Sequence, residues 1–129
     1  GDMLLFGDVD LHVLSPLNKN TLHEENDDSI VILLRGFGIK VLFTGDAGLE
    51  VLEGIYSDEM TNLDVYKVSH HGSSYNNSLD FVQKLAPKVC VISVGKNSFG
   101  HPSLDVIVDL ERAGCEVFRT DRDGTVMIY

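Results

Sequence analysis

The segment LDVYKVSHHGSSYNNSLDFVQKLAPKVCVISV, residues 63–94, decides the fold class of this 129-residue chain. It opens with a β-rich run (63–69). Its middle (78–86) starts at a serine suited to cap a helix and stops before Pro87, and its end (88–94) is a nearly continuous apolar run typical of a buried strand. Strands that alternate with helices predict an α/β layered fold, a mixed sheet with flanking helices.

The sequence on either side continues this alternation. Before the segment we predict strands at 9–14, 29–35 and 40–46, with GFGI as a hairpin turn between the last two, and a short helix at 47–56. After it we predict a helix at 103–114, capped by Ser103 and ended by Gly114. Two last strands, 116–120 and 125–129, should flank an Asp123-Gly124 turn. Residues 15–28 form a polar connector.

A length of 129 residues suits one domain, and we treat 1–129 as a single unit. Hydrophobic residues make up 43% and charged residues 23%, which is typical of a globular protein. No apolar run approaches the roughly 20 residues that span a bilayer, so we expect a soluble chain. The formal net charge of −10 gives no basic surface for nucleic acid, so a phosphate substrate would need bound cations. Cys90 and Cys115 lie in apolar strand-like segments, and we predict buried free thiols.

Metal-ligating side chains follow three of the predicted strands. Asp46 ends VLFTGD, His70 and His71 end VYKVSHH, and His101 follows the glycine-containing loop after VISV. Because loops at one edge of a sheet converge, these residues could meet in one cleft. Carboxylate and neutral imidazole are common ligands of zinc and manganese.

Each of these residues also has a purely structural explanation. An N-cap for the helix at 47–56 would account for Asp46, a hydrogen-bonded turn for the paired histidines, and a loop role for His101. We read His12 as a solvent-facing strand residue and His23 as a surface residue of the acidic connector.

Three linked motifs carry a resemblance to a known family. NDDSIVILLRGFGIKVLFTGDAG, DVYKVSHHGSS and VCVISVGKNSFGHPSLDVIVDLERAGCEVFRTDRDGTVMI resemble the later half of the metallo-β-lactamase-type domain of ComEC-like competence proteins, and stand-alone hydrolases of the same branch share the motifs. The resemblance implies a four-layer αββα sandwich, of which this chain would be the C-terminal half. It also implies a role in bacterial DNA uptake.

The resemblance assigns roles residue by residue. Asp46 matches an aspartate that bridges two metals, one of His70 and His71 matches a ligand of the second metal, and His101 matches a catalytic histidine near the substrate. Two divalent ions, zinc or manganese, would activate a hydroxide that hydrolyses the phosphodiester bonds of DNA. Further candidate contacts to the substrate phosphate are Ser73, Lys96 and Asn97, for each of which a polar loop residue is the simpler interpretation.

The family's main ligand cluster, His-x-His-x-Asp-His, does not occur in this sequence. We therefore expect either a fragment that needs the missing N-terminal half, or a catalytically silent structural or interaction module. A hydrolase of small phosphoesters is a third alternative. The parent could be a bacterial membrane protein that carries this domain on its extracytoplasmic side. Half of a sandwich would leave one apolar sheet face uncovered and prone to self-association.

Overall fold

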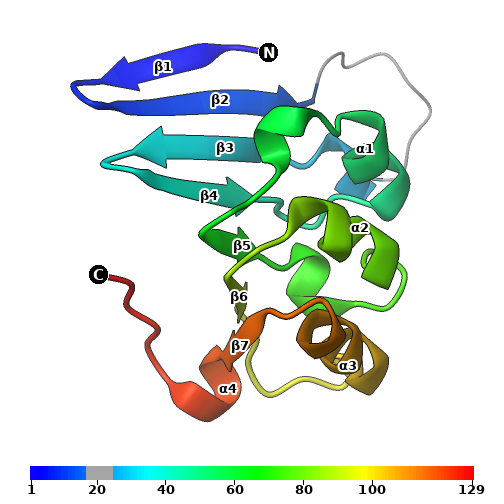
Figure 1. Cartoon of the computed structure of the whole chain (residues 1–129). Coiled ribbons are helices and arrows are strands. Elements are labelled where there is room, and N and C mark those ends of the chain that lie inside the picture. Colours follow the sequence, from blue (N-terminus) through cyan, green and yellow to red (C-terminus); the bar gives the residue numbers. More distant parts are fainter. Residues whose placement is uncertain (17–24) are drawn as a thin grey trace.

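A computed structural model describes residues 1–16 and 25–129, and these residues form one mixed seven-stranded sheet in the order β1-β2-β3-β4-β5-β6-β7 (Figure 1). Neighbouring strands from β1 to β4 are antiparallel, and from β4 to β7 they are parallel. The strands are β1 Met3–Phe6, β2 Val9–Ser15, β3 Val31–Gly36, β4 Ile39–Phe43, β5 Val65–Lys67, β6 Val89–Ile92 and β7 Glu116–Arg119.

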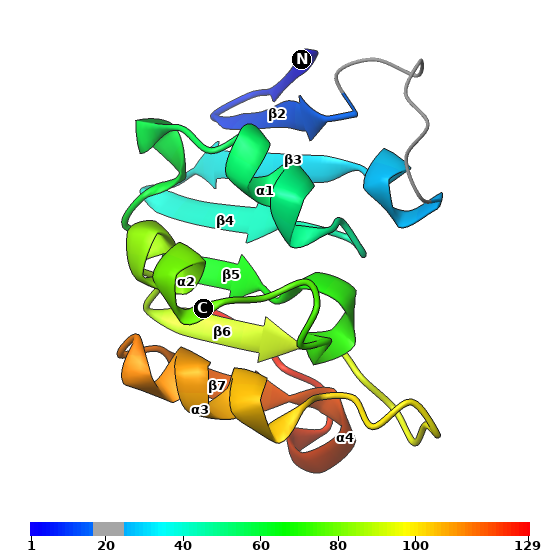
Figure 2. The same ribbon diagram turned by 90° about the vertical axis from the view of Figure 1, so that its right-hand side faces the viewer.

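The three helices of the parallel crossovers cover one face of the sheet. In Figure 2 they lie in front of the sheet. They are α1 Leu49–Gly54, α2 Leu79–Leu85 and α3 Leu104–Arg112, and a single turn, α4 Thr120–Asp123, follows β7. Short 3₁₀ segments occur at η1 Glu25–Asp28, η2 Asp58–Met60 and η3 Ser69–Gly72. The predicted α/β class is confirmed.

The core lies between the sheet and this helix layer. Alternate residues of the central strands point into it, such as Leu42, Tyr66 and Ile92, which are fully buried. Phe81 from α2 and Leu110 from α3 meet them from the helix side. Burial of large apolar side chains stabilises each by roughly 1.5–3 kcal/mol, so this layer carries most of the hydrophobic stabilisation.

The predicted helix limits are largely confirmed. Ser78 caps α2 by accepting a hydrogen bond from the Phe81 N–H at 3.2 Å, and the helix ends at Ala86 in the left-handed conformation, directly before Pro87. Gly114, with φ +84°, follows α3 as predicted. Ser103 stands at the N-cap of α3, but its side chain makes no capping hydrogen bond.

Two predictions at the end of the chain and in β6 are wrong. Residues 125–129 form no strand, because a helical turn follows β7 instead: the Asp123 carboxylate accepts the backbone N–H of Arg119 at 2.8 Å. Val126 and Ile128 instead line a groove on the helix-free face of the sheet. β6 is buried on its helix side only, since Val89 and Val91 on the other side remain partly exposed.

The helix-free face is strongly apolar. A groove of about 460 Å³ runs over it between β3–β6 and the C-terminal tail, and its lining includes Leu34, Val41, Phe43 and Val91. The described residues supply one sheet and one helix layer, so the four-layer sandwich and self-association through this face stay predictions. Across the described ranges, no helix is long and apolar enough to cross a membrane.

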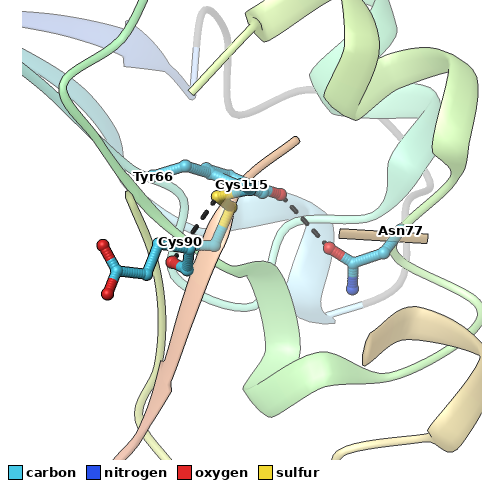
Figure 3. The surroundings of a disulfide bond; sticks show 5 residues. Tyr66, Asn77, Cys90 and Cys115 are labelled. Carbon is cyan, nitrogen blue, oxygen red and sulfur yellow. Dashed lines mark hydrogen bonds between the residues drawn. A yellow bond between two sulfur atoms is a disulfide. The ribbon is translucent and has the colours of Figure 1, made fainter. Parts of the chain in front are cut away.

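The two cysteines form a disulfide, which corrects our prediction of free thiols. Cys90 in β6 and Cys115, directly before β7, are joined with a Cα–Cα distance of 5.9 Å (Figure 3). Their burial is as predicted, 0% and 5% exposed. The pairing depends on the parallel register that sets Val89 opposite Glu116, which no local pattern reveals. Closing a loop with this sequence separation of 25 stabilises a fold by about 3 kcal/mol.

Asp64 ties the start of β5 to both neighbouring strands, and we expect its removal to destabilise the fold in a pH-dependent way. Its carboxylate accepts the Lys40 N–H at 2.8 Å and the Lys88 ammonium at 2.7 Å. The bond from Lys88, followed by that from Lys40, lowers the pKa of Asp64 below 3.8. Its contribution is therefore fully present above pH 3.8 and is lost as the pH falls through the lower folded-state value. Asp64→Ala should cost about 1–2 kcal/mol at pH 7 in urea unfolding, and the difference should shrink near pH 3. An equal difference at both pH values would contradict this account.

Candidate functional site

The predicted site residues meet at one edge of the sheet, where β4, β5 and β6 end. Asp46 follows β4, His70 and His71 lie in η3 after β5, and His101 stands in the loop between β6 and α3. Parallel pairing of these three strands in register brings their carboxyl ends to the same edge. The predicted convergence is what the structure shows.

The histidine turn has an unusual backbone. Three consecutive residues are left-handed: His70 at φ +46°, His71 at φ +54° and Gly72 at φ +83°. For a residue other than glycine this conformation costs roughly 1–2 kcal/mol. Strain of this kind is concentrated at functional sites, because the surrounding structure must hold it in place. Here the His70 N–H donates to the Gly45 carbonyl at 3.1 Å, which binds the turn to the loop of Asp46.

Gly72 connects the histidine turn to the loop of His101. A Cβ atom at Gly72 would lie only 2.6 Å from Cβ of Pro102, so glycine permits a close approach as well as the positive φ. The Ser103 N–H donates to the Gly72 carbonyl at 2.9 Å. This contact sets His101 beside His70, with ring centroids 5.7 Å apart.

His71 is oriented toward Asp46. Its Nδ1 lies 2.6 Å from the carbonyl oxygen of Ser93, at the end of β6. A carbonyl oxygen can only accept, so Nδ1 donates and the proton of the neutral ring resides there. Nε2 is then an acceptor, and it lies 3.6 Å from Oδ1 of Asp46. Two electron-pair donors that face each other at this distance are suited to share a cation.

The structure rules out the N-cap role that we considered for Asp46. Helix α1 begins at Leu49 with Gly48 as N-cap, and no side chain makes a capping hydrogen bond, so Asp46 is not a cap. Its carboxylate is 40% exposed at the sheet edge. Hydrogen bonds from two side chains hold the backbone around Asp46 in place. The Asn76 amide donates to the carbonyl oxygens of Asp46 and Ala47, and the Ser69 hydroxyl donates to the carbonyl oxygen of Ala47 at 2.7 Å.

His70 is the more enclosed member of the pair. Its Nδ1 is buried and has no hydrogen-bond partner among the described residues. The ring packs against those of His71 and His101, at centroid distances of 6.2 and 5.7 Å. An unpartnered buried nitrogen costs about 1–3 kcal/mol, and it sits within the candidate site itself.

The three further candidates for phosphate contact occupy different positions. Ser73 is buried, 3% exposed, and its hydroxyl accepts the Tyr75 N–H, so the side chain supports the loop from inside. Lys96 is exposed. Asn97 holds the loop together, because its Oδ1 accepts the N–H groups of Phe99 and His101 while its Nδ2 donates to Gly95 and His101.

Lys67 was missed by the sequence analysis. It is the only charged side chain among those that line the apolar groove, and its ammonium donates to the Val68 carbonyl at 2.9 Å. Burial lowers the pKa of Lys67, and the nearby Asp46 carboxylate partly opposes that effect. The sequence signal that could have identified this residue is a single lysine in the apolar run VYKV, three residues before His70.

The other two histidines lie apart from this edge or outside the described residues. His12 is not solvent-facing as predicted: its side chain is 26% exposed, and Nδ1 lies 3.8 Å from Glu59 without a hydrogen bond. His23 lies outside the described residues. Within residues 1–16 and 25–129, no group of three or more His, Cys, Asp or Glu side chains is arranged to hold a metal ion. Asp46 and His71 fit a metal as two donors of a larger ligand set.

Comparison with known proteins relates the chain to part of three longer ones. It is 37% identical to ComE operon protein 3 of Bacillus subtilis (strain 168), over 98% of this chain and 16% of that protein. It is 34% identical to Recombination protein 2 of Haemophilus influenzae, over 90% of the chain, and 30% identical to Competence protein ComA of Neisseria gonorrhoeae, over 92%. The chain spans about one sixth of the length of each relative. No model of a known family matches it.

Proposed function

Because this chain is related along nearly its whole length to a segment of ComEC-like competence proteins, we propose that it serves DNA uptake as part of a metal-dependent phosphodiesterase or nuclease. The facing pair Asp46 and His71 is the observation that carries the proposal. It occupies the edge of the sheet where ligands bind in open α/β folds. The metallo-β-lactamase-type sandwich stays part of this proposal, with a second sheet over the apolar face.

Each residue of the edge has a defined task in this account. A divalent cation, manganese or zinc, would be held by Asp46 and His71 and would stabilise negative charge on a phosphoryl oxygen. The Ser93 carbonyl keeps the His71 ring turned toward Asp46. His101 can donate a proton to an oxygen of the phosphate or of the leaving group. Water molecules or groups from outside this segment would complete the ligand set.

We also propose that this domain lies outside the cytoplasm. Disulfides form and persist in oxidising environments outside the cytoplasm. The buried Cys90–Cys115 disulfide therefore supports an extracytoplasmic position for this domain. At that position it would meet incoming DNA before transport.

A second candidate function rests on a specific observation. The described residues contain no cluster of three or more metal-ligating side chains. A catalytically silent module that contacts DNA or another part of the uptake machinery would need no such cluster. Metal-dependent binding of DNA together with strand cleavage would favour the nuclease over the catalytically silent module.

We expect this chain to bind a 5′-labelled oligo(dT) strand in the presence of Mn²⁺ and to lose that binding in EDTA, measured by fluorescence anisotropy. Asp46→Asn should weaken the Mn²⁺-dependent binding by about tenfold or more, because it removes a carboxylate ligand. Asp8→Asn is the matched control: it removes the same charge from the exposed turn between β1 and β2, at the opposite edge of the sheet.

Strand cleavage is followed on a gel in the same samples. Binding that is equal in Mn²⁺ and in EDTA, or two variants that behave alike, would contradict the proposed function. Mn²⁺-dependent binding without cleavage would favour the silent module.

A further inference from the structure

The aromatic ring of Phe99 is exposed to solvent beside the candidate site. Phe99 lies in the loop between β6 and α3, two residues before His101, and is 81% exposed. Its ring stacks on the ring of His101, with centroids 6.1 Å apart and an interplanar angle of 22°. The next loop at this edge, after η3, carries a second highly exposed ring, Tyr75.

The loop holds Phe99 in place although its side chain is exposed. Oδ1 of Asn97 accepts the N–H of Phe99 at 3.0 Å and the N–H of His101 at 3.1 Å, while Nδ2 of Asn97 donates to Gly95 and His101. The contact of Pro102 with Gly72 fixes the far end of the loop. The backbone of Phe99 is thus fixed, and its exposed ring lies beside His101 at the candidate site, where loop residues commonly serve binding.

The geometry is suited to a flat, aromatic ligand group. His101 lies beside Phe99 in a near-parallel, offset arrangement, and the high exposure of the Phe99 ring leaves area for a stacked ligand ring. Nucleobases stack on aromatic side chains regardless of sequence, and one stacked base tightens binding by about fivefold or more. The exposed Lys96 of the same loop can meet the neighbouring backbone phosphate.

We propose that Phe99 stacks on an unpaired nucleobase of the substrate strand. This contact places the adjacent phosphodiester bond next to His101. The inference rests on the proposed function of the Asp46–His71 edge, and it adds selectivity. A base inside a duplex is stacked on its neighbours and cannot cover Phe99, so the site prefers a single-stranded segment over a duplex. Phosphoesters without a base lose this contact.

The test compares two strands in Mn²⁺ by fluorescence anisotropy: oligo(dT) and an abasic strand of the same length and charge. Oligo(dT) should bind about fivefold tighter or more, the equivalent of one stacked base. Phe99→Ala should remove that difference and leave binding of the abasic strand unchanged, while Phe99→Trp should retain it. Phe37→Ala, which removes an 80% exposed ring from the β3–β4 turn at the opposite edge, should change neither.

Three results would overturn the inference, and the first two are equal affinity for both strands in the wild-type chain and an unchanged preference for oligo(dT) in Phe99→Ala. The second result would assign Phe99 to another contact, such as a protein surface. Failure of the proposed function looks different, because binding of the abasic strand would then be independent of Mn²⁺. Loss of abasic-strand binding in Phe99→Ala would also overturn the inference, since it would mean that Phe99 acts by holding His101.

Discussion

Replacing Gly72 by alanine is expected to lower the free energy of unfolding by about 2–5 kcal/mol. Gly72 has φ +83°, and for alanine this left-handed conformation costs roughly 1–2 kcal/mol. Its Cβ would also lie 2.6 Å from Cβ and 3.1 Å from Cα of Pro102. Relief of such a contact requires the two loops to move apart, and overpacking of this kind costs about 1–3 kcal/mol.

The matched control is Gly114→Ala. Gly114 has φ +84°, and a Cβ there would meet no atom within 4 Å, so only the conformational cost applies. Urea unfolding should therefore give a loss for Gly72→Ala that exceeds that for Gly114→Ala by about 1 kcal/mol or more. Equal losses would mean that the approach of Gly72 to Pro102 is not tight in solution.

The same substitution tests how the site is assembled. His70 and His101 come from loops that meet at Gly72 and Pro102, so separating the loops should separate the imidazole rings, now 5.7 Å apart. A stability loss at Gly72 should therefore be accompanied by weaker binding of the oligonucleotide.

The sequence was sufficient to predict the alternation of strands and helices between β4 and β7 and the edge that carries the site. Caps such as Ser78 and stops such as Pro87 are local signals, and they mark helix ends well. That Asp46, His71 and His101 share one edge follows from strand direction, because parallel strands end at a common edge.

The features that sequence reasoning missed depend on long-range contacts. The Cys90–Cys115 pairing follows from the register of β6 with β7, and the orientation of the His71 ring toward Asp46 follows from the Ser93 carbonyl, 22 residues further along the chain. The final segment alternates like a strand, yet the Arg119–Asp123 hydrogen bond closes a helical turn before it and sends the tail across the apolar face.

The second large effect is expected at the proposed metal ligands, Asp46 and His71. Titration of the purified chain with Zn²⁺ or Mn²⁺ in a calorimeter should show binding of an ion that the double variant Asp46→Ala/His71→Ala no longer binds measurably. Single ligand losses should weaken binding by about tenfold or more, since even partners outside the ligand set contribute 10–100-fold. Asp8→Asn again controls for the loss of one charge at the opposite edge.

The most direct test of the central claim, that Asp46 and His71 share a cation, compares His71→Gln with His70→Gln in this titration. Only His71 has its Nε2 directed at Asp46, 3.6 Å away, through the hydrogen bond from Nδ1 to Ser93. We predict that His71→Gln loses metal affinity as Asp46→Ala does, while His70→Gln stays close to the wild-type chain. A loss confined to His70→Gln, or metal binding that survives in the double variant, would contradict the account.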